Sequence, residues 1–320
     1  MQRKSGILGT AVVALAAMFG SASAQANEFI TFGGGSTGGA FYSIAAGMAR
    51  IVELNVEGVQ ATARVTAATT ENTRLLGRER IEFALAAASG PYAAAAGLPP
   101  FENELYENVR YMATGYSSPF QIIVHDNSDV RSIADLPGKR VGVLVGITAQ
   151  DWFPRLAEVY GVDGQFQVFE LGAAELMTAL RDGNVDVAVI SAAAPSPAVS
   201  DLATSRSLRF IPVGTEQAEE MISTTHPFFY IDVISAGTYP GLNEDVTTIL
   251  NPILLVTHSG VSEELVYRVT QVLLDSNHSD LSAIHPDAGK FRVENGGVSM
   301  VIPPHDGAVR FYREHGIDLE

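Results

Sequence analysis

The residues best suited to bind a small anion lie in a glycine-rich turn near the N-terminal end of the chain. Residues Phe29 to Glu53 read FITFGGGSTGGAFYSIAAGMARIVE, with glycines between a short apolar run and an amphipathic stretch. Glycine lets backbone approach a ligand, and the first N–H groups of a helix carry partial positive charge. The turn predicts carboxylate capture by the backbone of Gly35, Thr37, Gly38 and Gly39, although an ordinary strand–helix turn has similar composition. The G-x-G-x-x-G spacing of a dinucleotide fingerprint is present over residues 33–38, but no acidic residue follows at the end of a strand about 20 positions on.

The other candidate ligand contacts are hydroxyl and aromatic side chains near predicted turns: Phe41, Tyr42, Thr69, Tyr92, Thr148 and Ser191. We expect one of Phe41 and Tyr42 to face the ligand and the other to pack in the helix core. Thr69 and Thr148 either contact the ligand or cap a helix. Ser191 ends an apolar strand, and Tyr92 either closes the pocket or lies in a loop.

Nearby cations and aromatic residues favour structural roles. Arg64 and Arg74 can pair with a carboxylate bidentately, but a solvated or structural ion pair is the more common arrangement. Trp152 follows the second turn and is expected in the core. The cluster Phe228–Tyr230 is expected to pack in the core or at a hinge.

Enzymatic chemistry has little support in the sequence. The G-x-S-x-G spacing occurs once, over residues 34–38 of the glycine-rich turn, where five glycines already account for it. There is no H-E-x-x-H zinc motif, and the seven histidines are scattered. The chain has no cysteine, which excludes disulfides and thiolate chemistry. We therefore predict no catalytic residue, no metal site and no cofactor.

The elements that position these residues alternate as strands and helices, which predicts an α/β fold. A strand over residues 140–145, the turn GITAQ and a helix over 151–160 repeat the pattern of the N-terminal turn. Strands are also expected over 81–87 and 185–191, each preceded by a helix, at 72–78 and 173–181. Ligands of open parallel sheets bind beyond the carboxyl ends of the strands, so the two turns predict a shared cleft.

Two extended segments, residues 119–125 and 253–258, resemble a pair of hinge strands between two lobes. We expect residues 25–120 and 256–320 to form one lobe and residues 121–255 the other. The fold class is then a two-lobed periplasmic binding protein, type II-like, with the ligand cleft between lobes that close by a hinge. Ser262 is expected to cap a C-terminal helix that ends near Ser276.

Residues 1–24 have the pattern of a cleavable signal peptide: Arg3 and Lys4, an apolar run too short to span a bilayer, and Ala22-Ser23-Ala24. No later segment is long and apolar enough for a membrane helix. The formal net charge of −16 gives no basic footprint for nucleic acid. We expect a periplasmic monomer that is not inserted in the membrane.

Five segments together resemble one family. They are residues 29–49, TAATTEN at 66–72, DLPGKRV at 135–141, SAGTYPG at 235–241 and HDGAVRFY at 305–312. In this order they are similar to the motifs of TAXI-type solute receptors of TRAP transporters. The resemblance implies two α/β lobes, a carboxylate ligand such as glutamate or another dicarboxylate or oxo-acid, and a TRAP-type membrane permease as partner.

The chain departs from the usual family pattern at three turns. Ala67 and Ala68 stand where the family often has two glycines, Ala87-Ala88 stand where it often has Gln-Ser, and residues 146–149 replace P-G-S-G. A pocket with fewer polar side chains favours a less polar ligand. Two further hypotheses stay open: an input protein of a sensory kinase, and a periplasmic enzyme.

Overall fold

The computed structural model describes residues 28–37, 39–224, 228–276 and 278–319. The expected signal peptide, residues 1–24, and the candidate ligand residue Gly38 lie outside the described residues. Among the described helices, none combines the length and the apolar character needed to cross a membrane.

The strands form one continuous sheet in the order β2-β1-β3-β10-β4-β7-β5-β6, with β8 beside β4 and β9 beside β10. Their bounds are β1 Glu28–Gly33, β2 Val59–Arg64, β3 Phe83–Ala87, β4 Val109–His125, β5 Arg140–Leu144, β6 Gln167–Leu171, β7 Val187–Ser191, β8 Leu208–Phe210, β9 Tyr230–Ile234 and β10 Val246–His258. The pairs β1–β2, β1–β3, β5–β6 and β5–β7 are parallel, and β4 and β10 are antiparallel to their neighbours. This is the mixed α/β arrangement expected from the sequence.

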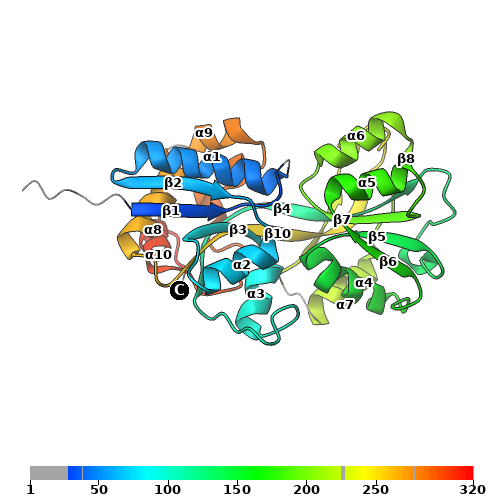
Figure 1. Ribbon diagram of the computed structural model, residues 1–320, viewed down its shortest axis with the longest axis horizontal. Coiled ribbons are helices and arrows are strands. Elements are labelled where there is room, and N and C mark those ends of the chain that lie inside the picture. The colour runs from blue at the N-terminus through cyan, green and yellow to red at the C-terminus, as the bar shows by residue number, and fades with distance from the viewer. Residues whose placement is uncertain (1–27, 38, 225–227, 277, 320) are drawn as a thin grey trace, which may run out of the picture.

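Helices cover the sheet in two groups that form two lobes (Figure 1). The α-helices are α1 Ala40–Asn55, α2 Thr69–Gly77, α3 Ser89–Ala96, α4 Phe153–Val159, α5 Ala173–Arg181, α6 Pro197–Ser205, α7 Thr215–Thr224, α8 Glu263–Gln271, α9 His278–Ile284 and α10 Asp306–Glu314. Helices α1 to α3 and α8 to α10 surround β1 to β3, and α4 to α7 surround β5 to β7. A π-helical turn η2, Thr148–Trp152, leads directly into α4.

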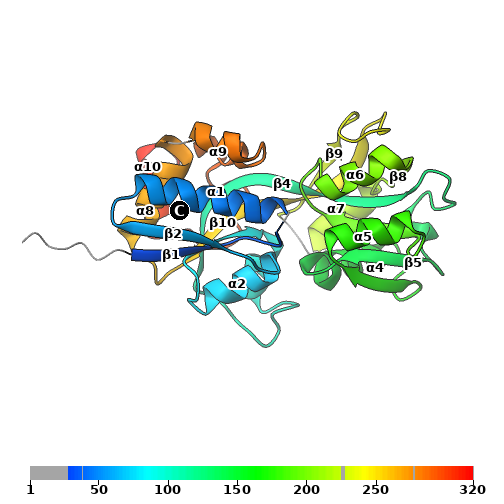
Figure 2. The same cartoon turned by 45° about the horizontal axis from the view of Figure 1, so that its top comes forward.

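Two long strands connect the lobes, as the turned view of β4 in Figure 2 shows. The first half of β4 pairs with β10, and residues from Phe120 onward pair with β7 and β8 of the second lobe. Likewise β10 pairs with β3 of the first lobe from Ile253 onward. The crossing therefore lies near Pro119 and Pro252, and the predicted hinge segments, 119–125 and 253–258, lie mostly just inside the lobes.

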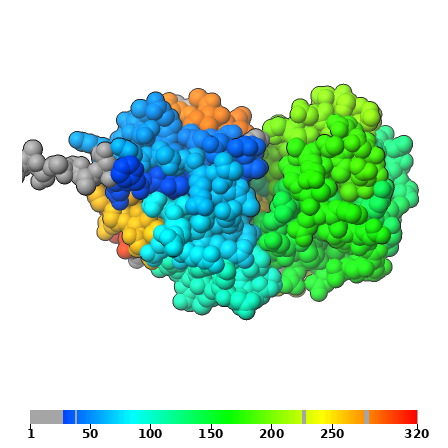
Figure 3. All heavy atoms as spheres, viewed as in Figure 1, coloured from blue at the N-terminus to red at the C-terminus, as the bar shows by residue number. Residues whose placement is uncertain are grey.

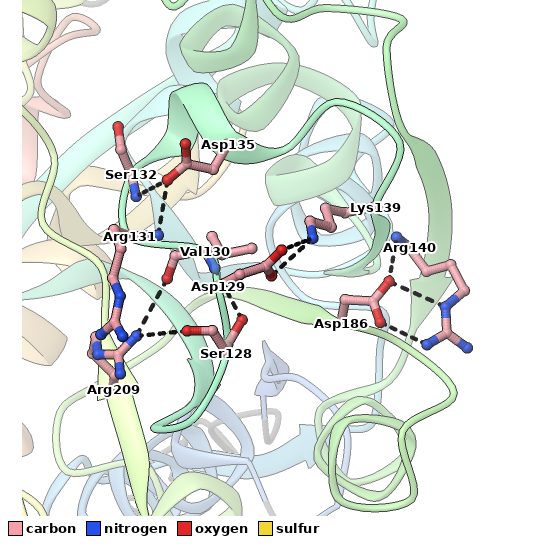
Figure 4. Close-up of polar contacts among 10 residues, drawn as sticks. All are labelled: Ser128, Asp129, Val130, Arg131, Ser132, Asp135, Lys139, Arg140, Asp186 and Arg209. Carbon is pink, nitrogen blue, oxygen red and sulfur yellow. Dashed lines mark hydrogen bonds and ion pairs between the residues drawn. The ribbon is translucent and has the colours of Figure 1, made fainter.

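An acidic residue ties matching strands together in each lobe. Glu82, just before β3, accepts a hydrogen bond from the Thr31 N–H on β1 at 2.7 Å. Asp186, just before β7, accepts from the Arg140 N–H on β5 at 2.8 Å and pairs with the Arg140 guanidinium (Figure 4). The hydrogen bond from Arg140 lowers the pKa of the Asp186 carboxyl. The repeated sequence pattern thus has the same structural use in both lobes.

Most predicted elements are confirmed within a few residues. The helix expected over 173–181 is α5, and Ser262 caps α8 by accepting a hydrogen bond from the Leu265 N–H. Helix α2 begins at Thr69, three residues before the predicted start at Asn72. The difference has a local cause, because Glu71 accepts from the Ala67 N–H at 2.7 Å and so closes the first turn early.

The core is continuous between the lobes. One buried cluster runs from Ile30 and Phe83 in the first lobe through β4 and β10 to Trp152 in the second. Trp152 stacks on Phe120 with ring centroids 3.5 Å apart, and Phe229 packs edge-on against Phe120. Trp152 and Phe229 are therefore core residues, as the sequence predicted.

Candidate functional site

A cavity of about 250 Å³ lies between the lobes. In Figure 3 the lobes meet along a furrow between the blue and cyan surface and the green surface. The cavity is lined from the first lobe, from the crossing strands and from the second lobe. All described lining residues are uncharged, being glycine, alanine, serine, threonine, aliphatic residues, one phenylalanine and one tyrosine. Such a wall recognises a ligand through backbone groups, hydroxyls and apolar contact.

The start of α1 forms one end of the cavity, where Gly39, Ala40 and Phe41 line it. Gly39 is the N-cap, and no side chain caps the helix. No acidic residue lies in the first turn of α1, so the partial positive charge of this sixteen-residue helix is not offset there. Free N–H groups at such a position suit an anion.

The turn after β2 is held in place from inside the first lobe. Thr66 donates to the Gly34 carbonyl oxygen at 2.9 Å and accepts from the Ala68 N–H at 3.2 Å. Asn72 donates to the carbonyl oxygens of Gly34 and Leu85, at 2.7 and 2.8 Å. These bonds connect the ends of β1 and β3 to the start of α2, so three turns of the first lobe are fixed relative to one another.

Thr69 lies where these turns meet, and its hydroxyl oxygen accepts a hydrogen bond from the Ala87 N–H at 3.0 Å. The side chain is 4% exposed and lines the cavity. Within the described part of the chain its hydroxyl proton has no acceptor, so it remains able to donate to a ligand. Gly90 is required beside it, because a Cβ there would lie 2.3 Å from the Thr69 methyl carbon.

Thr148 is the corresponding hydroxyl of the second lobe, in the first turn of η2. It lines the cavity, is 2% exposed, and its hydroxyl makes no hydrogen bond with any described residue. The hydroxyl oxygen itself is open to the cavity, where a ligand or water can bind it. Thr148 is thus positioned to bind a molecule in the cavity.

The loop after β7 completes the wall of the second lobe, where Ser191, Ala192 and Ala193 line the cavity. Gln121 on β4 donates to the Ala192 carbonyl oxygen at 3.0 Å and accepts from the Tyr239 hydroxyl at 2.6 Å. That hydroxyl in turn accepts from the Ser196 N–H at 2.8 Å. Burial raises the pKa of Tyr239 to about 12, so it stays a neutral donor.

The crossing strands supply three further lining residues: Tyr116 and Ser118 from β4, and Ile253 from β10. Ser118 is 4% exposed, and its hydroxyl has no partner among the described residues. Burial raises the pKa of Tyr116 well above its usual value, so its hydroxyl stays protonated.

Six of the predicted ligand residues line the cavity: Gly35, Gly39, Phe41, Thr69, Thr148 and Ser191. Their contact with a ligand stays a prediction. Thr37, Tyr42 and Tyr92 do not line it; Thr37 is exposed, and the Tyr92 ring packs on Phe228 with centroids 5.1 Å apart. Of the pair Phe41 and Tyr42, it is Phe41 that faces the cavity.

Sequence reasoning missed several lining residues. Ile253 begins the predicted hinge segment 253–258 and Ser118 lies one residue before the segment 119–125, and both segments were interpreted only as connections between lobes. Gly172 and Ala173, at the start of α5, form a fourth helix start that lines the cavity. The sequence predicted a helix beginning at Ala173. It did not indicate that this helix start lies beside the other turns at the cavity.

The two arginines considered as ligand partners lie elsewhere. Arg74 pairs with Glu104 at 2.7 Å, donates to the Pro100 carbonyl oxygen and lies over the Phe101 ring. Arg64 is exposed and does not line the cavity. The prediction that Arg74 has a structural role is therefore confirmed.

Three of the five sequence motifs have structural roles. In DLPGKRV, Lys139 pairs with Asp129 and Arg140 with Asp186 (Figure 4). In SAGTYPG, the Tyr239 hydroxyl holds the loop after β7 through its hydrogen bonds with Ser196 and Gln121. In HDGAVRFY, the His305 ring accepts from the Gly307 N–H and contacts the Val261 carbonyl oxygen at 3.0 Å, which ties α10 to the segment before α8.

The family model described as the NMT1-like family matches residues 32–316. The chain belongs to the NMT1-like family. The matched residues cover both lobes and every segment that lines the cavity.

Solved structures share the fold at low identity. XAC2383 from Xanthomonas citri, solved bound to ATP, is 11% identical with a TM-score of 0.51, covering 89% of this chain and 94% of that one. A putative L-cystine ABC transporter from Listeria monocytogenes is 13% identical with a TM-score of 0.50, covering 82% and 95%. The periplasmic aliphatic sulphonate binding protein SsuA from Escherichia coli is 16% identical with a TM-score of 0.47, covering 82% and 75%. The NMT1-like chain thus shares the two-lobed α/β fold of XAC2383 and of the putative L-cystine ABC transporter.

Proposed function

We propose that this chain is an extracytoplasmic solute-binding protein that captures a small carboxylate-bearing solute and delivers it to a TRAP-type membrane permease. The observation that carries the proposal is the uncharged cavity between the lobes, with the uncapped start of α1 on one side and the unpartnered Thr148 hydroxyl on the other. Membership of the NMT1-like family and the fold shared with a putative L-cystine ABC transporter support a role in transport.

The proposed mechanism is closure of the two lobes around the solute. The carboxylate docks first on the N–H groups at the start of α1 and on the Thr69 hydroxyl. Thr148 and Ser191 of the second lobe then add contacts that exist only in the closed form. This difference in contacts shifts the equilibrium between open and closed forms. Strands β4 and β10 are the hinge, because they cross between the lobes.

The permease class is inferred from the ordered motifs that resemble TAXI-type receptors. We propose that the closed form is what the TRAP-type permease recognises, and that the protein works as a periplasmic monomer after removal of residues 1–24. The division into residues 25–120 with 256–320 and residues 121–255 remains our proposal for the lobes; the strand pairings support it to within a few residues.

A binding role is favoured over an enzymatic one. Within the described residues, no group of three or more His, Asp or Glu side chains could hold a metal ion. Among the residues that the structure describes, no charged or imidazole side chain lines the cavity for general acid–base work. The proposal therefore assigns the hydroxyls of the wall to ligand binding.

The experiment is a thermal-unfolding screen of the exported protein against amino acids, dicarboxylates, oxo-acids and monocarboxylates. A ligand at 100 times its dissociation constant stabilises the folded state by about 2.7 kcal/mol. We expect at least one carboxylate to do so, and the matching amide or alcohol not to. Mass spectrometry of the denatured protein detects a solute retained from expression. If no carboxylate stabilises the protein and none is released from it, the proposed function is wrong.

A further inference from the structure

The cavity carries one anion site rather than two. We propose that the solute is a monocarboxylate with an uncharged, largely apolar body, and that diacids and amino acids are excluded. This inference rests on the proposed function, because it concerns the chemistry of the molecule held in the same cleft.

The anion site is the start of α1. Four helical segments begin at the cavity: α1, α2, η2 leading into α4, and α5. Glu71, Asp151 and Glu175 lie in the first turns of α2, η2 and α5, whereas the first turn of α1 has no acidic residue. A carboxylate in a first turn offsets the positive end of the helix dipole. The potential therefore favours one ligand carboxylate, at α1.

Buried hydroxyls independently indicate a ligand. The side chains of Thr148 and Ser118 are 2% and 4% exposed, line the cavity, and have no hydroxyl partner in the described part of the chain. Thr148 belongs to the second lobe and Ser118 to a crossing strand. Both donors can therefore serve one molecule that spans from α1 towards the second lobe.

The described wall has no ion partner for a second charged group. An ammonium or a second carboxylate is costly to bury without an oppositely charged side chain beside it. No described lining residue carries either charge. Beside its hydroxyls the wall presents apolar side chains, with Leu144, Ile147, Ile190 and Ile253 among them.

The backbone conformation of Ala68 also indicates a wall suited to an apolar ligand. It lines the cavity with φ 61° and ψ −141°, a conformation that glycine adopts freely and alanine does not. A methyl group is therefore kept on the wall at a position where glycine would be less strained. Strain of this kind points to a local function, and here the methyl adds apolar contact surface.

The cavity, of about 250 Å³, suits a small ligand and is open at its rim, where Val145 is 51% exposed. A five-carbon acid is a suitable probe, because pentanoate, glutarate and glutamate share a chain length and differ only in charged groups.

The test is isothermal titration of the exported protein, stripped of retained solute by reversible denaturation, with pentanoate, glutarate, glutamate and pentanamide. We expect pentanoate to bind at least ten times more tightly than glutarate or glutamate, and pentanamide to bind least. Tighter binding of glutarate or glutamate overturns the inference and leaves the proposed function standing. Binding of none of the four, together with no effect of any carboxylate in the thermal screen, overturns both.

A charge-switch variant gives a second readout. Val145 lines the cavity at the edge of the second lobe and is 51% exposed, so a longer side chain is accommodated there. In Val145→Arg we expect glutarate to gain at least tenfold in affinity relative to pentanoate, with Val145→Gln as the neutral control. If both variants change the ratio equally, or neither changes it, charge on the wall does not set the specificity.

Discussion

Gly146 of the second lobe lies close to Ala67 of the first lobe at the rim of the cavity. A Cβ placed on Gly146 would lie 3.9 Å from the Ala67 carbonyl oxygen, and Gly146 has a φ of 101°. Gly146 belongs to the turn before η2, and Ala67 to the turn before α2. The predicted GITAQ turn of the second lobe thus lies against the turn before α2 of the first lobe, across the cavity.

Thr148 tests whether the second lobe contributes to binding. In Thr148→Val we expect ligand affinity to fall about fivefold, because one hydrogen bond contributes about 1 kcal/mol. The melting temperature without ligand should not fall, since the hydroxyl has no described partner. Thr148→Ser keeps the hydroxyl and is the control. Unchanged affinity in Thr148→Val, measured by titration, contradicts closure through Thr148.

Ala68 and Ala67 form a matched pair for backbone strain. We expect Ala68→Gly to stabilise the ligand-free protein by about 1 kcal/mol, because the positive φ no longer opposes a Cβ. Ala67→Gly, at a position without positive φ, should destabilise by a few tenths to about 1 kcal/mol through backbone entropy. Urea unfolding measures both. Opposite signs confirm the account, and equal losses argue that Ala68 is not strained.

Tyr239 and Tyr116 form a matched pair for buried hydroxyls. Tyr239→Phe leaves the Gln121 oxygen and the Ser196 N–H without their partner, so we expect a loss of about 1–3 kcal/mol in unfolding free energy. The Tyr116 hydroxyl is buried without a hydrogen-bond partner among the described residues, so Tyr116→Phe should be neutral or slightly stabilising. A larger loss for Tyr116→Phe would show that its hydroxyl has a structural partner.

The buried imidazole of His305 predicts that the folded protein loses stability in acid. Burial lowers the pKa of this imidazole below its ordinary value near 6.5. The folded state therefore binds the proton less readily than the unfolded chain, so the contribution is complete above about pH 6.5 and is lost as the pH falls towards the lowered pKa. Protonation would also oppose the hydrogen bond that the ring accepts from Gly307.

The variant His305→Asn separates this effect from other acid-sensitive groups. An asparagine oxygen can accept from the Gly307 N–H as an N-cap and does not titrate. We expect the unfolding free energy of the variant to fall less between pH 7.5 and 5 than that of the parent. Burial also lowers the pKa of His258, so part of the dependence remains. Parallel curves for parent and variant would contradict the assignment to His305.

Local patterns made much of the fold predictable. Apolar runs bounded by turns identified β3, β5 and β7, and the helix of residues 173–181 was predicted with its observed bounds. The turn at Gly39 and the hydroxyls Thr69 and Thr148 were also found, because a helix start after a strand is visible in sequence. These signals extend over a few residues, and local physics determines them.

The unpredicted part depends on distant contacts. Nothing local to Ser118 or Ile253 indicates that the cavity opens beside them, since that follows from how β4 and β10 cross between the lobes. Tyr92 was considered for the pocket, but its position is set by packing on Phe228, more than a hundred residues away in sequence. Helix α2 begins at Thr69, earlier than predicted, where the Glu71 carboxylate accepts a hydrogen bond from the Ala67 N–H.

The most direct test of the central claim is a crystal structure of the protein with the tightest-binding carboxylate from the screen. The account predicts the carboxylate within hydrogen-bonding distance of the N–H groups at the start of α1, with Thr69 on one side. It also predicts that the Thr148 hydroxyl of the second lobe contacts the same molecule. A ligand bound outside the cavity, or bound with its carboxylate away from α1 and without contact to Thr148, would contradict the account.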